Sequence, residues 1–93
     1  MTDDLGTPPE LAWLPVDRLY VDPSYQRTLE SGRSQKLIEK IAAEFNWLRF
    51  GAIVAVLVDY KSWFSRWKIV DGQHRTAGAR KRGIQHVPAL VHK

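Results

Sequence analysis

The chain has 93 residues, enough for one domain with a modest core, and its 44% hydrophobic and 26% charged residues are typical of a globular protein. It contains no cysteine, which excludes disulfides, thiolate–zinc sites and cysteine nucleophiles. The longest apolar run, residues 52–58, is far too short to cross a bilayer, and the N-terminus lacks the layout of a signal peptide. We therefore expect a cytoplasmic protein with no membrane partner.

The net charge of +4 is unevenly distributed along the chain. Residues 1–47 carry five Lys and Arg against eight acidic residues, whereas residues 48–93 carry nine against two. This asymmetry favours an anionic ligand on the second half. A solvated basic helix face is an equally good interpretation of the same pattern.

The first residues predict a leader followed by a single domain. Residues 1–10 contain a glycine and two prolines and are expected to be flexible, so the domain spans residues 11–93. Residues 11–15 predict a short edge strand, which ends at a proline because proline cannot donate to the ladder.

The next segments lead into the clearest helix of the sequence. Residues 16–19 predict a turn or short helix with Asp17 as a possible cap, and residues 20–28 are expected to be irregular because Asp-Pro favours a turn. In residues 34–45 apolar side chains recur with the helical period and form one stripe. We expect Ser34 or Ser31 to cap this helix.

The second half predicts a hairpin, a helix and a last strand. Residues 52–58 are continuously apolar and β-branched, which is typical of a central strand covered on both faces. A turn at residues 59–62 leads to a second strand at 63–70. A helix at 72–82, ended by a glycine, and a strand at 86–91 complete the chain. The order is β-α-β-β-α-β, a small α/β domain.

The most informative segment is the turn from the strand 63–70 into the helix that follows. A strand that turns sharply into a helix presents the first, unpaired backbone N–H groups of that helix, which suits phosphate or another anion. Gly72 removes a Cβ where a phosphate could approach closely. Asp71 either caps the helix or holds a divalent cation that bridges phosphates.

Three further residues of this turn are candidate ligands of the anion. Gln73 and His74 supply donors, and His74 is a candidate general base, although a lone histidine is more often structural. Arg75 opposes the helix dipole, so a partner must explain it: a phosphate, which we favour, or an ion pair with Asp17 or Asp22.

Aromatic residues of the strand at 63–70 are interleaved with three basic residues: Lys61, Arg66 and Lys68. This pattern suits stacking on bases together with phosphate contact, but core and rim packing gives the same pattern in a small domain. Alternation predicts Trp67 and Ile69 as a core pair and leaves Phe64 more exposed.

Several motifs in order resemble the ParB/sulfiredoxin superfamily. They are a Leu-Pro-x-x-x-Leu segment at 14–19, a Pro-x-Tyr-Gln-Arg loop at 23–27, a Gly-led helix start at 72–75 and an Arg-Gly-Ile…Val-Pro-Ala-Leu-Val close at 82–91. The resemblance covers about residues 14–91 and implies a ParB/sulfiredoxin-like fold.

The helix start departs from the best-known members of that superfamily. Where ParB partition proteins have Gly-Glu-Arg-Arg, this chain has Gly-Gln-His-Arg, so CTP specificity is not implied. Gln73 stands at the cysteine position of sulfiredoxins, which excludes sulfinic acid reductase chemistry. The run Asp-Gly-Gln-His-Arg looks like the signature of DndB-type regulators, and it is similar to motifs of GmrSD-type restriction subunits and ParB-like serine kinases.

Carried over residue by residue, the resemblance implies a phosphate-binding set: Gly72, Gln73, His74, Arg75 and, from the earlier loop, Gln26 and Arg27. Asp71 would assist a metal ion, and Asp71 and His74 are the candidate catalytic residues.

We therefore expect a domain that binds a nucleoside triphosphate, with Mg²⁺-dependent hydrolysis in the service of a DNA transaction in partition, phage or defence, and with a homodimer as a possible assembly. A first alternative is a DNA-binding or nicking nuclease-like module, using Lys61, Arg66 and Lys68. A second is a small-molecule kinase, for which Asp22 or Glu30 would supply the catalytic carboxylate.

Overall fold

The computed structural model describes residues 5–61 and 64–93, and for residues 59–61 and 64 it describes the backbone alone. Residues 1–4 of the expected leader, and Ser62 and Trp63 of the expected hairpin, lie outside the described residues. Residues 5–9 are exposed and have no regular structure, whereas Glu10 already belongs to the first strand.

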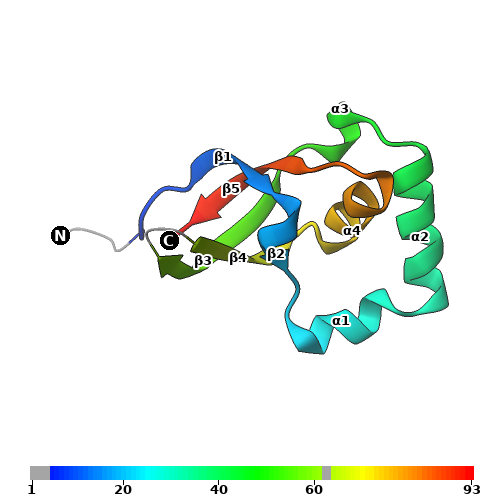
Figure 1. Ribbon diagram of the computed structural model, residues 1–93, viewed down its shortest axis with the longest axis horizontal. Coiled ribbons are helices and arrows are strands. Elements are labelled where there is room, and N and C mark those ends of the chain that lie inside the picture. The colour runs from blue at the N-terminus through cyan, green and yellow to red at the C-terminus, as the bar shows by residue number, and fades with distance from the viewer. Residues whose placement is uncertain (1–4, 62–63) are drawn as a thin grey trace.

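One twisted five-stranded sheet forms half of the molecule (Figure 1). Its strands in spatial order are β1 (Glu10–Pro15), β5 (His86–His92), β3 (Ile53–Lys61), β4 (Phe64–Asp71) and β2 (Leu19–Tyr20). The pairs β1–β5 and β3–β4 are antiparallel, and the pairs β3–β5 and β2–β4 are parallel. The predicted central strand is therefore β3, in the middle of the sheet.

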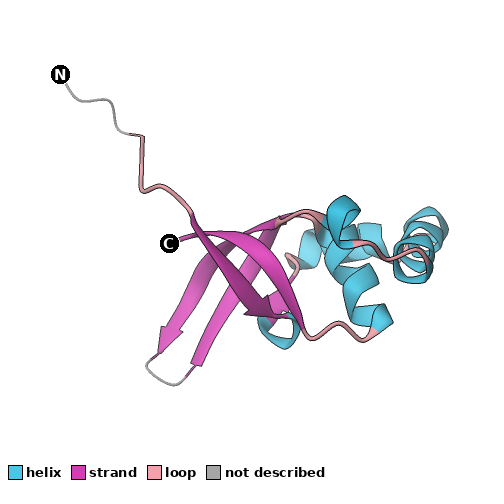
Figure 2. Cartoon of the chain, turned by 90° about the horizontal axis from the view of Figure 1, so that it is seen from above, coloured by secondary structure: helices cyan, strands magenta, loops and turns pink. Residues whose placement is uncertain are grey.

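The helices gather at one end of this sheet, as Figure 2 shows from above. They are a 3₁₀ turn η1 (Val16–Arg18), then α1 (Pro23–Leu29), α2 (Gly32–Ala43), α3 (Trp47–Phe50) and α4 (Gln73–Arg82). The predicted α/β class is confirmed, with β2, α1 and α3 added to the predicted elements.

The expectation of an irregular segment at 20–28 is wrong. The Asp22 side chain accepts a hydrogen bond from the Ser24 N–H, and Pro23 begins α1. Proline suits the first helical position because its φ is already helical and its missing N–H has no partner to lose there. The same Asp-Pro pair that signals a turn therefore starts a helix here.

Capping confirms one expectation, the cap of α2 by Ser31, and differs from another, the cap by Asp17. The η1 turn follows Pro15 without a side-chain cap, so Asp17 does not cap it. Ser31 caps α2 by accepting from the Ser34 N–H, which starts this helix at Gly32. The short α3 depends on Asn46, whose side chain accepts from two backbone N–H groups.

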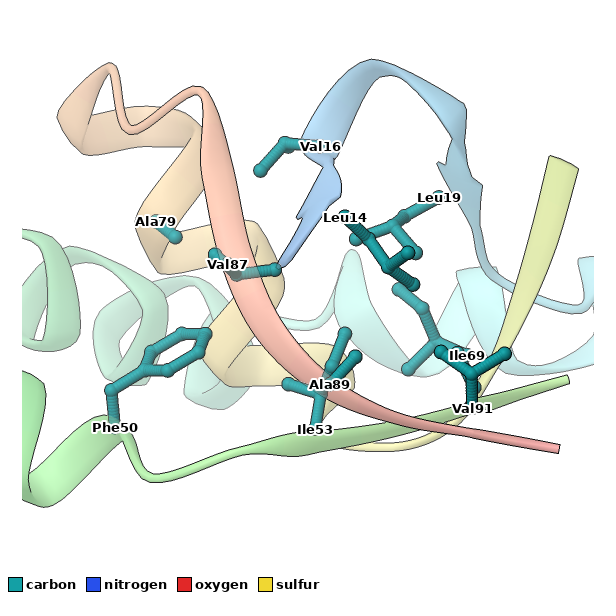
Figure 3. Packing of buried hydrophobic residues seen from close by; sticks show 11 residues of the cluster. Leu14, Val16, Leu19, Phe50, Ile53, Ile69, Ala79, Val87, Ala89 and Val91 are labelled. Carbon is teal, nitrogen blue, oxygen red and sulfur yellow. The ribbon is translucent and has the colours of Figure 1, made fainter. Parts of the chain in front are cut away.

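The core lies on one face of the sheet, under α4 and the η1 turn (Figure 3). Ile53 and Ala55 of β3 are fully buried there, whereas the alternate residues Val54 and Val56 are only half-buried. The expectation that β3 is covered on both faces is therefore wrong.

The expected pair in β4 does face the core. Ile69 is buried and Trp67 packs against the cluster, as predicted. The side chain of Phe64 lies outside the described part of the structure, so its greater exposure stays a prediction.

Candidate functional site

The turn between β4 and α4 is built around a glycine. Gly72 adopts φ +101°, a left-handed conformation that side chains rarely allow, and a Cβ there would lie 2.6 Å from Cγ2 of Ile53. The close approach that requires glycine is therefore made by β3 and not by a ligand. This differs from the sequence-based interpretation, although the turn itself has the predicted form.

Helix α4 runs parallel to α2. The two helices are in contact near their starts through Ser34 and His74 and at their ends through Ala42 and Arg82, and the contacts Ile41–Gly78 and Glu39–Lys81 lie between. Gly78 allows the close approach, because a Cβ there would lie 2.4 Å from Cγ2 of Ile41. Since the helices are parallel, their positive N-terminal ends lie together.

The link between these two ends is a hydrogen bond between side chains. His74 Nε2 lies 2.9 Å from Ser34 Oγ, and Ser34 is buried, with 6% of its surface exposed. The Tyr25 ring of α1 meets the His74 ring edge-on, with 6.4 Å between their centres. Sequence reasoning considered Ser34 only as a possible cap. Ser34 lies one turn before Ile38, on the face of α2 that points inward. This spacing could have indicated from the sequence that its side chain is buried and faces another element.

The paired helix ends offer several free backbone donors. Among the described residues, none accepts a hydrogen bond from the backbone N–H of Gln73, His74 or Arg75. Neither helix has an acidic residue in its first turn. Unpaired N–H groups and two aligned helix dipoles create a positive potential at this point, suited to an anion.

Asp71 does not cap α4, so that interpretation is wrong. The N-cap is Gly72, without a side-chain hydrogen bond. Asp71 instead forms an ion pair with Arg75, with 3.3 Å between Oδ2 and Nη2, and 73% of its side chain is exposed.

Arg75 makes contacts that the sequence did not predict. Its Nη1 donates to the carbonyl oxygens of Phe50 at 2.6 Å and Ala52 at 3.4 Å. Its acidic partner is Asp71, so the alternative of an ion pair with Asp17 or Asp22 is wrong. The guanidinium therefore ties the start of α4 to the connection between α3 and β3, and it still keeps 29% of its side chain exposed.

A pocket of about 190 Å³ opens beside Arg75, between α2 and α3. Its apolar lining includes Leu37, Ile41, Phe45 and Phe50. The charged residues around it are Lys40, Arg49, Arg75 and Glu44, so cations exceed acids three to one. An anionic molecule with a flat apolar part would match this combination.

The two candidate residues from α1 are placed differently. Gln26 lines a smaller pocket of about 100 Å³ together with Gln73 and Thr76, so the structure brings it to the start of α4. Arg27 is exposed in the last turn of α1 and lines neither of these pockets. Gln73 turns its amide nitrogen back to the carbonyl of Val70, at 3.2 Å.

The carboxylates considered for kinase chemistry lie on either side of α1. Two hydrogen bonds from Ser24, through its hydroxyl and its N–H, lower the pKa of Asp22 below its usual value, so this carboxylate is a helix cap in its ionised form. Glu30 directly follows α1 and is exposed.

The basic residues of the hairpin lie away from the start of α4. Arg66 and Lys68 point to the face of β4 opposite the core-facing Trp67 and Ile69, and the Arg66 guanidinium lies 4.8 Å from the centre of the Tyr20 ring. Because Trp67 packs on the core, its ring is not free to stack on a base. Lys61 belongs to β3, and its side chain lies outside the described part.

No cluster of three or more metal-ligating side chains occurs in residues 5–61 and 64–93, searched for His, Cys, Asp and Glu. A metal ion here would therefore depend on Asp71 and on oxygens of a bound ligand. Over the same residues, no helix is long and apolar enough to span a membrane.

Comparison with known proteins gives similarity in structure alone. No protein-family model matches the sequence, and no curated protein matches it. Among solved structures, the chromosome-partitioning protein ParB from Caulobacter crescentus, complexed with CTP-γ-S, superimposes with a TM-score of 0.63 and 19% identity, over 90% of this chain and 44% of ParB. Its complex with the centromeric parS site gives a TM-score of 0.61 and 20% identity, over 88% and 38% of the two chains.

Two other structures are similar over nearly the whole chain. Sulfiredoxin from Arabidopsis thaliana superimposes with a TM-score of 0.60 and 20% identity, over 91% of this chain and 86% of that protein. A free serine kinase variant in complex with AMP gives 0.55 and 20% identity, over 99% of this chain and 34% of the kinase. The chain has a ParB/sulfiredoxin-like fold, as the motifs predicted, and it spans less than half the length of the ParB and kinase structures.

Proposed function

We propose that this chain binds a nucleoside triphosphate, with the phosphates at the paired N-termini of α2 and α4. The observation that carries the proposal is the hydrogen bond of 2.9 Å between Ser34 and His74, because it joins two parallel helix starts at one point. Each start contributes unpaired N–H groups and the positive end of a dipole. A multiply charged phosphate chain is the ligand that gains most from two such ends.

The roles of the turn residues follow from this placement. Backbone N–H groups of Gln73 and His74 would donate to phosphate oxygens, and the His74 ring would add a ring N–H donor. Arg75 contributes positive charge at the start of α4, while its Nη1 holds the connection between α3 and β3. Arg27 is assigned no direct contact, and Gln26 approaches the site from α1 through the smaller pocket.

The pocket beside Arg75 is a suitable place for the nucleoside. It begins at the first turn of α4 and continues along Leu37 and Ile41 of α2, one to two turns beyond Ser34. A flat base would cover the apolar side chains there. Lys40 and Arg49 at its edge would favour an anionic molecule over a neutral one.

Asp71 is the residue that would hold Mg²⁺ together with the phosphates. Its side chain is exposed and only one of its oxygens pairs with Arg75, which fits an ion held by one carboxylate and ligand oxygens. The ion would neutralise phosphate charge and polarise the bond that breaks on hydrolysis. His74 lies within hydrogen-bond distance of Ser34, which fixes its ring for proton transfer to or from a nearby water.

Isothermal titration calorimetry with ATP, CTP and GTP, with and without Mg²⁺, tests this proposal. We expect binding of at least one triphosphate, weakened about tenfold by His74→Ala because a hydrogen bond to phosphate is lost. His86→Ala is the matched control, since this exposed histidine lies at the opposite end of α4. Absence of binding by all three triphosphates, or equal effects of the two substitutions, would refute the proposal.

A second function is favoured by one observation, the two basic residues on the outer face of β4, of which Arg66 is exposed and Lys68 half-buried. Arg66 and Lys68 project from the face of the sheet opposite the core, where a DNA backbone could reach them. In that case the chain would shift DNA in a salt-dependent way, and Arg66→Ala with Lys68→Ala would remove the shift while His74→Ala would not.

A further inference from the structure

The sheet has two edges, and they are protected differently. The edge strand β2 is two residues long, and such a short strand offers little for another chain to pair with. The opposite edge, β1, has six residues with the sequence Glu-Leu-Ala-Trp-Leu-Pro. Its one charged residue, Glu10, is paired with Lys93 of the same chain at 3.2 Å. The segment leading into β1 runs away from the sheet and does not cover this edge (Figure 2).

Large apolar side chains are exposed beside this edge. Leu11 is 71% exposed and Trp13 is 62% exposed, and both point away from the core because Ala12 and Leu14 point into it. Leu90 is the partner of Leu11 on β5 and shares its face. Trp47 of α3, which is 47% exposed, meets the Trp13 ring edge-on at 5.5 Å. We call these four residues the tryptophan face.

The area of the tryptophan face is large for a small monomer. A fully buried aromatic side chain removes roughly 150–250 Å² from water, so the exposed parts of Trp13 and Trp47 together present on the order of 200 Å². The two leucines and the half-buried Pro88 extend the patch beyond that. A standard interface buries about 800 Å² per partner, of which a little over half is apolar. The tryptophan face supplies most of such an apolar centre.

We propose that this face and the β1 edge form the interface of a homodimer with two-fold symmetry. A second copy is the fitting occupant because two identical β1 strands are self-complementary when they run antiparallel, as a two-fold axis requires. The free N–H and C=O groups of one edge then pair with those of the other, and the two sheets become one continuous sheet. Each Trp13 is brought close to the axis, where it is covered by the partner.

Sedimentation velocity and light scattering, from micromolar to near-millimolar chain, test the dimer. We expect a species of twice the 10.7 kDa monomer mass. Trp13→Lys and Leu11→Lys should each weaken the dimer by about tenfold or more, since both place a charge in the buried centre. Leu5→Lys is the control, because Leu5 is equally apolar and 88% exposed but lies outside the tryptophan face.

Circular dichroism of each variant separates loss of the dimer from loss of the fold, and the exposed Leu11 provides the second variant if Trp13→Lys does not fold. A wild-type chain that stays monomeric at every concentration would overturn the proposal. So would a dimer that survives both substitutions, or one that Leu5→Lys weakens equally.

Discussion

The two ends of α4 use their polar groups in opposite ways. At its C-terminal end, Arg80 donates to the carbonyl oxygens of Val16 and Leu19, and Arg82 donates to that of Ala42 at the end of α2. At its N-terminal end, the first backbone N–H groups have no acceptor among the described residues. The last turn is tied to other segments by its arginine side chains, whereas the first turn keeps backbone N–H groups without a described acceptor beside the tie that Arg75 makes.

The contacts of these arginines bear on the uneven distribution of charge along the chain. The second half of the chain carries most of the basic residues, but three arginines of α4 bind backbone carbonyls of other segments. Each such bond uses guanidinium N–H donors that are then not free to contact a ligand. The formal charge of a segment therefore overstates the positive charge that is available to a ligand.

The largest expected effect comes from separating α4 from α2. Gly78→Ala places a Cβ 2.4 Å from Cγ2 of Ile41, so the two helices must move apart. We expect the free energy of unfolding to fall by about 3 kcal/mol, as for overpacking in a dense core. Gly32→Ala is the control, because a Cβ there meets nothing within 4 Å. Urea unfolding followed by circular dichroism measures both, and equal effects would contradict the parallel close packing.

The next largest effect concerns the C-terminal end of α4, where Arg80 binds backbone carbonyls. Arg80→Ala removes two hydrogen bonds to the segment between β1 and α1, and we expect a loss of about 2 kcal/mol in the free energy of unfolding. Nucleotide affinity should fall less than it does with His74→Ala, because Arg80 lines the smaller pocket but lies two turns from the start of the helix. Chemical unfolding and calorimetry test the two statements separately. If Arg80→Ala strongly lowered nucleotide affinity but left the free energy of unfolding unchanged, the C-terminal end of α4 would not have the structural role assigned to it.

A smaller effect on stability is expected at the N-terminal end of α4, where His74 meets Ser34. Ser34→Ala removes the bond to His74, which should cost about 1 kcal/mol in stability. The affinity for nucleotide should fall several-fold, since the His74 ring is no longer held. Ser65→Ala, at the other end of β4 from α4, serves as the comparison. If both variants bind nucleotide as the wild type does, the Ser34–His74 pair has no part in binding.

The smallest effect concerns the cap of α1, outside both ends of α4. Hydrogen bonds from Ser24 lower the pKa of Asp22, so its contribution to stability is present above the ordinary value of 3.8 and is lost as the pH falls through the lower folded-state value. Asp22→Ala should therefore lower the thermal midpoint at neutral pH, and its difference from the wild type should shrink below pH 3.8. Thermal melts from pH 7 to pH 2 check this. A difference that is constant with pH would contradict it.

The sequence predicts the elements whose signals are local. The apolar run of β3, the stripe of α2 and the glycine after α4 all lie where their periodicity and turn chemistry place them. The Asp22-Pro23 pair misled the prediction, because the same dipeptide starts either a turn or a helix. The choice between a turn and a helix depends on the residues that follow, because the helix buries Leu29.

The candidate site is predictable in its position but not in its partners. The turn at Gly72 was found from the sequence, whereas Ser34 lies forty residues before His74 and enters through the parallel packing of two helices. The carbonyl partners of Arg75 likewise come from a connection far along the chain. Contacts of this kind depend on tertiary packing, which local periodicity does not encode.

The central claim is that a phosphate-bearing ligand binds between the starts of α2 and α4. Backbone amide chemical shifts, recorded by NMR while CTP or ATP is added, test it most directly. We predict the largest shifts at Gly32, Arg33, Gln73 and His74, with little change at Arg82. Shifts concentrated on the outer face of β4 or at the C-terminal end of α4, or no shifts at all, would contradict the claim.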